Sequence, residues 1–197
     1  MRPKYFDQKL ISSAIYVLRS GGIVAFPTDT VYGIAAMPFN RKAVKKLYRI
    51  KGRSDKKPIA LLVSSRKLVK KFAKNVPAKA KRLMNKYWPG PLTLILSKRS
   101  CVPGLLTAGL TTIGIRMPKN NIALKLIKKA GGALAVTSAN LSGGKPATSA
   151  GQLRKLKGVD LVIDGGKCRI GIPSSVVLVK DKELVVLRKG PVQKLKY

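Results

Sequence analysis

Polar side chains follow apolar runs at five places in this chain of 197 residues. Each apolar run is typical of a buried strand or of one face of a helix, and polar groups at the ends of such elements can converge on a ligand. Hydroxyl, amide, ammonium and guanidinium groups in these positions suit the recognition of phosphate or carboxylate. The five groups are Thr28 to Thr30, Lys51 with Arg53, Arg116, Ser138 to Asn140, and Pro173 to Ser175.

Lys51 and Arg53 lie two residues apart where the chain leaves a predicted helix, so both can turn toward one anion. Arg supplies a planar fork and Lys a point charge. From spacing alone, solvated charges that complement the helix dipole are the favoured interpretation. Ser138 and Asn140 are followed by two glycines, which permit close backbone approach to a ligand. They suit a turn cap equally well.

Arg116 ends an apolar strand and has no acidic neighbour in the sequence, which fits a ligand carboxylate or phosphate. The stretch from Thr28 to Thr30 follows Pro27, which should end the preceding strand. By itself this stretch is more typical of a turn whose side chains bond their own backbone. Tyr87 and Trp88 are expected to pack in the core and the adjacent turn rather than to stack on nucleobases.

The scarcity of acids limits the mechanisms open to this chain. It has seven Asp and Glu residues and no histidine, which excludes Ser-His-Asp and Cys-His sites and argues against a two-metal carboxylate site. The common phosphate-loop and dinucleotide fingerprints are absent. Cys101 and Cys168 lie far apart, so neither a disulfide framework nor a zinc site is expected. Catalysis would have to rest on positioning and positive charge.

The chain carries 41 Lys and Arg residues, for a formal net charge of +34 and a pI near 10.8. Such a surface attracts polyanions, and nucleic acid is the obvious class. The lysines occur in every predicted helix, so a general compositional bias explains them as well as a specific groove does. No apolar run approaches the ~20 residues of a membrane span, and the N-terminus lacks a signal-peptide core. We therefore expect a soluble, cytoplasmic protein without a membrane partner.

The elements that would position these groups alternate between helix and strand without a repeat or a composition break. Helices are predicted from Asp7 to Leu18, from an Asn40 cap to Gly52, and over Arg66–Lys74, Pro77–Lys86, Ile122–Ala130 and Ser149–Leu156. Strands are predicted over Ile23–Phe26, Pro58–Val63, Leu92–Leu96, Ile113–Met117, Ala133–Thr137, Val159–Ile163, Ser175–Val179 and Leu184–Leu187. The last two should form a hairpin. The predicted fold is therefore one α/β domain, residues 1–197, with a mixed sheet.

The motifs FPTDTVYGIA, KGRSDKKPIALLV, YWPGPLTLIL, IGIRMP, VTSANLSGGKPAT, VIDGG, GIPSSVV and VLRKG stand in this order. In this respect the chain resembles the YrdC/TsaC family of threonylcarbamoyl-AMP synthases from about Asp7 to Pro191. The resemblance implies a twisted mixed sheet with surrounding helices and a basic concave cavity. It also implies a nucleotidyltransferase that converts L-threonine, bicarbonate or CO2, and ATP into threonylcarbamoyl-AMP and pyrophosphate. The product would serve the modification of the tRNA adenosine beside the anticodon.

The resemblance also assigns roles to particular residues. It implies threonine contacts by Thr30, Arg116, Ser138 and Ser174. It implies ATP contacts by Lys51, Arg53, Thr112, Asn140, Thr148 and Arg188. Lys51, Arg53, Ser138 and Asn140 would form the catalytic set, and Mg²⁺ would be held mainly by the ATP phosphates. Asp29 would be a structural cap or, alternatively, a carboxylate for the substrate amine or for Mg²⁺.

The implied partners are tRNA or double-stranded RNA on the basic surface, and a downstream complex that transfers the threonylcarbamoyl group. The chain is similar to the short, single-domain form of the family. It departs from many longer relatives at Lys57 and Leu62, and in Lys119, Asn120 and Asn121 after the RMP motif. An RNA-binding or ribosome-assembly factor with the same fold is the alternative that the net charge suggests. A stand-alone relative of the carbamoyl-transfer domains of hydrogenase maturation factors is a weaker one.

Overall fold

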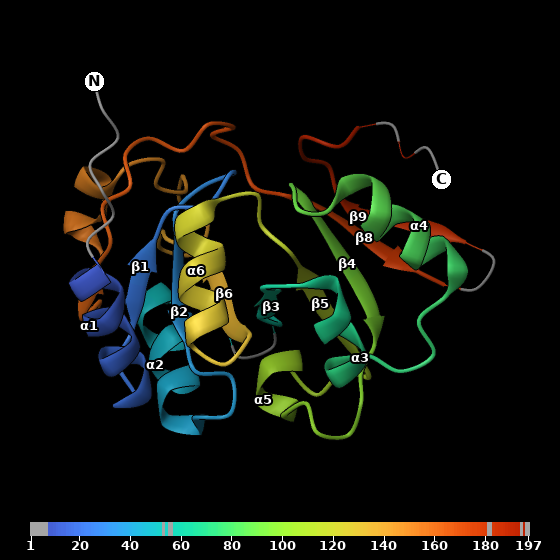
Figure 1. Ribbon diagram of the computed structural model, residues 1–197, viewed down its shortest axis with the longest axis horizontal. Helices are drawn as coiled ribbons and strands as arrows, with labels where there is room; N and C mark the ends of the chain where they lie inside the picture. Colours follow the sequence, from blue (N-terminus) through green and yellow to red (C-terminus); the bar gives the residue numbers. More distant parts are fainter. Residues whose placement is uncertain (1–7, 53, 55–56, 181–182, 194, 196–197) are drawn as a thin grey trace.

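One continuous sheet runs through the part of the chain that the computed structural model describes, namely residues 8–52, 54, 57–180, 183–193 and 195. Its spatial order is β7-β1-β2-β6-β3-β5-β4-β8-β9 (Figure 1). The bounds are β1 Val24–Phe26, β2 Gly33–Ala36, β3 Ala60–Val63, β4 Leu92–Ser97, β5 Thr112–Arg116, β6 Ala133–Ser138, β7 Leu161–Val162, β8 Ser175–Val179 and β9 Leu184–Arg188.

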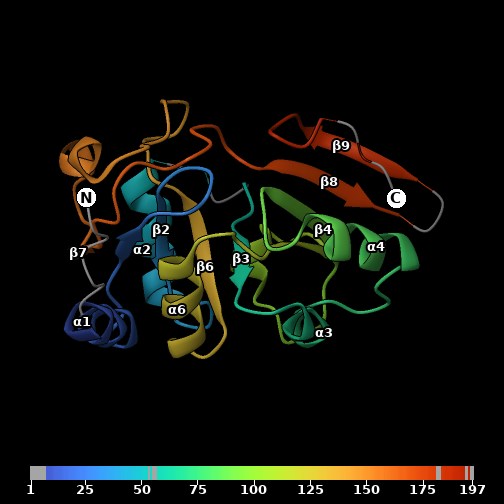
Figure 2. The same ribbon diagram turned by 45° about the horizontal axis from the view of Figure 1, so that its top comes forward.

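The sheet is mixed, as predicted. β1 with β7, β3 with β5, and β4 with β8 are parallel pairs, and the remaining neighbours are antiparallel. The predicted hairpin is the antiparallel pair β8 and β9. Figure 2 shows the strands running from β2 through β6 and β3 to β4 and the β8–β9 pair, with helices packed around them. The α/β fold with a twisted mixed sheet is therefore confirmed.

The helices lie on both faces of the sheet. They are α1 Gln8–Arg19, α2 Arg41–Lys51, α3 Val69–Phe72, α4 Ala78–Tyr87, α5 Gly104–Thr107 and α6 Asn121–Lys129, with 3-10 turns at Arg66–Leu68 and Ala150–Lys155. α1 and α6 cover one face through a core that includes Leu62, Leu134 and Val136. A second core lies on the opposite face and includes the buried sides of α2 and α4. No helix in the described ranges is long and apolar enough to cross a bilayer.

The ends of α2 are fixed by local chemistry, which matters because Lys51 is its last residue. Asn40 Oδ1 accepts a hydrogen bond from the Ala43 amide at 3.0 Å, an ordinary N-cap. Gly52 takes a φ of 55° and donates its amide to the carbonyls of Arg49 and Tyr48, which is a left-handed C-cap. Both predicted ends of this helix are confirmed. The predicted Asp7 cap of α1 lies outside the described residues.

Two predicted helices differ in detail from the structure, and the short helix α5 was not predicted. The helix predicted over Arg66–Lys74 is a 3-10 turn followed by the single turn of α3. It ends because Ala73 bridges to Lys98 and the Lys74 amide donates to the Ser97 carbonyl at 2.9 Å, which draws the chain toward the end of β4. α5 was not predicted, since its four residues carry no periodic signal. The helix predicted near Ser149 is a 3-10 turn.

Candidate active site

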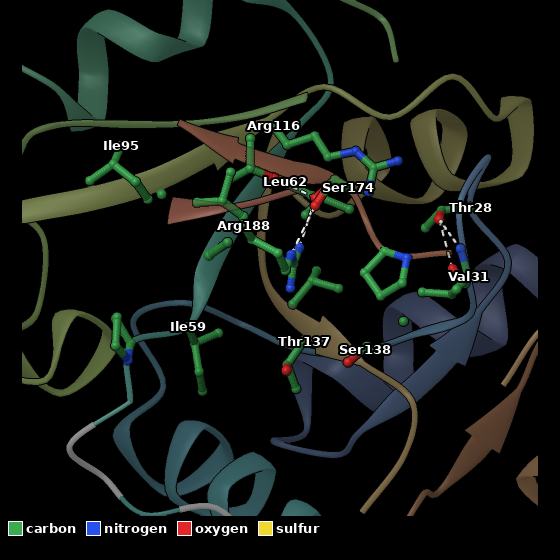
Figure 3. A pocket seen from close by; sticks show the side chains of 18 of the residues that line it. Thr28, Val31, Ile59, Leu62, Ile95, Arg116, Thr137, Ser138, Ser174 and Arg188 are labelled. Atoms are coloured by element: carbon green, nitrogen blue, oxygen red, sulfur yellow. Dashed lines mark hydrogen bonds between the residues drawn. The ribbon is translucent and has the colours of Figure 1, made fainter. Parts of the chain in front are cut away.

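A cavity of about 300 Å³ opens on the sheet face that α1 and α6 cover elsewhere. Leu62 and Val136 take part both in the core under these helices and in the cavity lining. In Figure 3, Ser174 and Arg188 lie on one side of the cavity, and Thr137 and Ser138 lie on another. The lining residues with polar side chains are Thr28, Thr93, Arg116, Thr137, Ser138, Ser174 and Arg188.

Gly114 keeps the floor of the cavity open at the centre of β5. A Cβ atom at this position would stand 3.1 Å from Ile95 Cδ1 and 3.4 Å from the Cβ of Ala60. Side chains alternate along a strand, so Gly114 and Arg116 share one face of β5 and Thr112 belongs to the same face. Thr112 begins the strand at the end opposite Arg116 and is not among the residues that line the cavity.

Arg116 is held from three sides at the end of β5, and only 5% of its surface is exposed. Its Nε donates to the Gly90 carbonyl at 3.0 Å and its Nη1 donates to Thr30 Oγ1 at 2.8 Å. Its Nη2 forms an ion pair with Asp29 Oδ1. Burial lowers the pKa of the guanidinium, and the charge of Asp29 opposes that shift. The structure therefore brings Thr30 and Arg116 together in one rigid arrangement.

Asp29 changes the sequence-based interpretation of Arg116. Arg116 has no acidic neighbour in the sequence, which predicts a ligand anion as its partner, but in the structure its partner is Asp29, 87 residues away. Asp29 also caps the backbone, because its Oδ1 accepts the Lys119 amide at 3.0 Å. Its Oδ2 is buried without a hydrogen-bond partner among the described residues. The carboxylate is thus a cap, as expected, and also the counter-ion of Arg116.

Ser174 and Arg188 form the second polar group of the cavity. Arg188 donates from Nε to the Ser174 carbonyl at 2.9 Å and from Nη2 to Ser174 Oγ at 3.1 Å. Ser174 Oγ also lies 2.8 Å from Thr93 Oγ1. Sequence reasoning missed Thr93, whose only signal is a hydroxyl in the apolar run of β4. The predicted site residues Ser174 and Arg188 are therefore in direct contact, and Thr93 holds the Ser174 hydroxyl in place.

Lys51, Ser138 and Asn140 form the third group, at the point where α2 and β6 end. Lys51 Nζ contacts the Ser138 carbonyl at 2.7 Å, Ser138 Oγ at 3.2 Å, the Asn140 carbonyl at 3.0 Å and Asn140 Oδ1 at 2.8 Å. Only 2% of Lys51 is exposed, so its interpretation as a solvated charge was wrong. The C-cap ends α2 at Lys51, whose side chain reaches the end of β6. The ammonium group in turn holds the loop that carries Asn140 in place.

The remaining predicted residues differ in position. Asn140 Nδ2 turns back to the carbonyls of Leu141 and Gly144, at 2.6 and 2.7 Å, so the amide also caps its own turn. Thr148 follows Ala147, whose amide pairs with the Ala139 carbonyl at 3.1 Å. Thr148 therefore lies near the third group, although it does not line the cavity. Arg53 lies outside the described residues.

The donor set of the site favours anions over metal ions. In the described ranges, no group of three or more His, Cys, Asp or Glu residues is arranged to hold a metal ion.

Cys168 is buried near Asp29 and Arg116, and burial raises the pKa of its thiol. Tyr87 is half-buried and Trp88 is buried, with its indole Nε1 donating to the Leu92 carbonyl at 2.6 Å. The packing role expected for Trp88 is confirmed.

Both the sequence and the structure of this chain are similar to those of one group of known proteins. The Sua5/YciO/YrdC family model, described as "Telomere recombination", matches residues 16–190. The threonylcarbamoyl-AMP synthase of Pyrococcus abyssi is 41% identical over 175 residues, which are 88% of this chain and 52% of that protein. The threonylcarbamoyl-AMP synthase of Bacillus subtilis is 41% identical over 187 residues, 93% of this chain and 54% of that protein.

A crystal structure of P. abyssi Sua5 complexed with L-threonine matches with a TM-score of 0.87 and 40% identity. The match covers 90% of this chain and 53% of that one. The chain described above thus spans about half the length of these relatives.

Proposed function

The chain belongs to the Sua5/YciO/YrdC family, and on that premise we propose that it is an L-threonylcarbamoyladenylate synthase. The observation that carries the proposal is that the groups Thr30/Arg116, Ser174/Arg188 and Lys51/Ser138/Asn140 each place at least one residue in the lining of one cavity. These lining residues are Arg116, Ser138, Ser174 and Arg188. Two relatives that are 41% identical are named threonylcarbamoyl-AMP synthases, which supports the same assignment.

The proposed reaction forms one carbamate bond and one mixed anhydride. The amine of L-threonine attacks bicarbonate or CO2 and gives a carbamate, with loss of water when bicarbonate is used. A carbamate oxygen then attacks the α-phosphorus of ATP, the bond to the β-phosphate breaks, and pyrophosphate leaves. Neither step needs a histidine or a nucleophilic side chain. Such a reaction depends on holding two anions close together and on stabilising charge at the α-phosphate.

Threonine is proposed to bind beside Arg116 and Thr30. The guanidinium is fixed by Gly90, Thr30 and Asp29, so its position costs little further ordering when a carboxylate arrives. Ser138 and Ser174 supply hydroxyls on other sides of the same cavity. The solved P. abyssi Sua5 complex with L-threonine, at 40% identity, supports threonine as the ligand.

ATP is proposed to bind toward Lys51, Arg53, Asn140, Thr112, Thr148 and Arg188. Lys51 Nζ already contacts four acceptors, so we assign it first to fixing Ser138 and Asn140, with its charge acting on the phosphates from that position. Mg²⁺ would arrive with ATP and be bound mainly by the phosphate oxygens, because the described residues offer no carboxylate cluster for it.

The experiment is a pyrophosphate-release assay that omits one substrate at a time. Release should require ATP, threonine and bicarbonate together. Asn140→Ala and Arg53→Ala should each lower turnover about 100-fold, the range seen when one transition-state contact is removed. The matched controls are Asn85→Ala and Arg82→Ala, both on the exposed surface of α4. Release without threonine, or full turnover in both site variants, would overturn the proposal.

A synthase of this kind needs partners that use its product. Threonylcarbamoyl-AMP would be handed to a complex that transfers the threonylcarbamoyl group to tRNA, and the protein is expected to act in the cytoplasm with that tRNA. We propose residues 7–191 as the core of one catalytic domain.

An RNA-binding or ribosome-assembly role is a second candidate, supported by the net charge of +34. RNA affinity that survives in Asn140→Ala, without any pyrophosphate release by the unaltered protein, would favour it.

A further inference from the structure

A second cavity, of about 470 Å³, lies on the other side of the Thr28–Asp29 segment. We call it the basic cleft. It shares Thr28 with the active-site cavity but otherwise has its own lining. Besides Pro27 to Asp29 and Val192, three segments line it: the end of α4 with the following turn, the loop after β5, and the loop after β7. The lining residues used below are Asp29, Lys86, Tyr87, Lys119, Lys167 and Arg169.

Four cationic side chains converge on the basic cleft. Lys86, Lys119, Lys167 and Arg169 are all exposed, and no ion pair joins them to an acid among the described residues. Asp29 is the acidic residue of the lining, and its charge is offset by the ion pair with Arg116. The cleft therefore keeps an uncompensated positive charge, whereas both arginines of the active-site cavity are tied by hydrogen bonds.

Hydrogen bonds fasten the backbone of two loops that carry these cations to Asp29 and Thr30. The Ile170 amide donates to the Asp29 carbonyl at 3.1 Å, and the Gly171 amide donates to the Thr30 carbonyl at 2.9 Å. The Lys119 amide donates to Asp29 Oδ1 at 3.0 Å. The loop after β5 and the loop after β7 are thus fastened to the same two residues, Asp29 and Thr30. A concave surface with several fixed like charges focuses its potential and gains stability when an anion neutralises it.

We propose that the basic cleft is a second anion site, which binds phosphate groups outside the active-site cavity. An RNA strand and free pyrophosphate share this chemistry. Tyr87 lies in the wall, with Lys86 Nζ 5.9 Å from the centre of its ring. An aromatic face beside cations also suits a nucleobase next to its phosphate. The proposal does not rest on the synthase activity.

The test compares two charge-reversed proteins that carry the same net charge. Lys167→Glu with Arg169→Glu alters the basic cleft. Lys42→Glu with Lys45→Glu alters exposed positions of α2 that line neither cavity. A fluorescein-labelled RNA hairpin is titrated by anisotropy at several salt concentrations, and pyrophosphate by calorimetry. Circular dichroism checks the fold, and the neutral pair Lys167→Gln with Arg169→Gln repeats the test with a milder change.

The cleft variant should lose about tenfold in affinity for its true ligand and show a shallower salt dependence, as expected when two phosphate contacts are removed. The control should lose about twofold at most. A loss confined to the hairpin identifies RNA as the source of the phosphate, and a loss confined to pyrophosphate identifies the free anion. Equal losses in the two variants for both probes would overturn the proposal, because the cleft would then be ordinary basic surface. Pyrophosphate release with ATP, threonine and bicarbonate should persist in the cleft variant.

Discussion

Replacing Asp29 with Asn should show how strongly the Arg116 site depends on its counter-ion. Asp29 and Arg116 are 8% and 5% exposed, and removal of one partner from a buried pair costs about 3–5 kcal/mol. Asn keeps an oxygen that can accept from the Lys119 amide and from Arg116. We therefore expect the free energy of unfolding to fall by about 3 kcal/mol, the low end of this range. For a chain of this size, that loss lowers Tm by about 6–12 °C.

Urea unfolding gives the free energy of unfolding for the wild-type protein, Asp29→Asn and the control Asp160→Asn. Asp160 pairs with Lys46 at 2.7 Å, but its side chain is 38% exposed, so the control should lose about 0–1 kcal/mol. Calorimetric titration with threonine should show weaker binding to Asp29→Asn, while ATP affinity stays near the wild-type value. If Asp29→Asn lost no more free energy of unfolding than Asp160→Asn and kept its affinity for threonine, the reasoning that Asp29 holds Arg116 in place would be refuted.

Lys51→Met should lower the stability by about 3 kcal/mol and nearly abolish pyrophosphate release, because the carbonyls and side chains of Ser138 and Asn140 lose a charged donor. Lys45→Met, on the exposed side of α2, should change neither quantity in urea unfolding and turnover assays. Tyr32→Phe tests a titration at high pH. Burial raises the pKa of Tyr32 to about 12 from its ordinary value of 10. Because the folded-state pKa is raised, this stability is fully present below pH 10 and is lost as the pH rises to 12. Between these values the wild-type protein should lose about 2–3 kcal/mol more than Tyr32→Phe, measured by urea unfolding at each pH. Tyr16→Phe, at an exposed position, should follow the wild-type curve.

The sequence predicted the elements well where local chemistry determines them. The Asn40 cap, Gly52 and the apolar face of α2 are local signals, and the helix ends where they indicate. The polar groups do lie at the ends of their strands, as at Arg116 and Ser138. Short segments were harder, because α5 and α3 have four residues each and their ends depend on contacts with distant chain.

The partnerships inside the site could not be read from the sequence, because they depend on sheet order. β3 lies between β5 and β6, and this arrangement decides which strand ends share a cavity. The Arg116–Asp29 pair spans 87 residues, and Thr93 reaches Ser174 across 81. The resemblance to a known family named Arg116, Ser138, Ser174 and Arg188, which line one cavity, but it gave no indication that Lys51 is buried or that distant segments form a basic cleft.

Asp29 Oδ1 joins one lining residue of the active-site cavity to one lining residue of the basic cleft. Asp29 Oδ1 accepts from Arg116 on one side and from the Lys119 amide, at the edge of the basic cleft, on the other. A ligand that pulls this carboxylate away from either donor must change the energy of the other contact. By thermodynamic reciprocity, its effect on the opposite cavity would be matched by an equal effect in return. The Asp29 carboxylate would then couple ligand binding in the basic cleft to ligand binding beside Arg116.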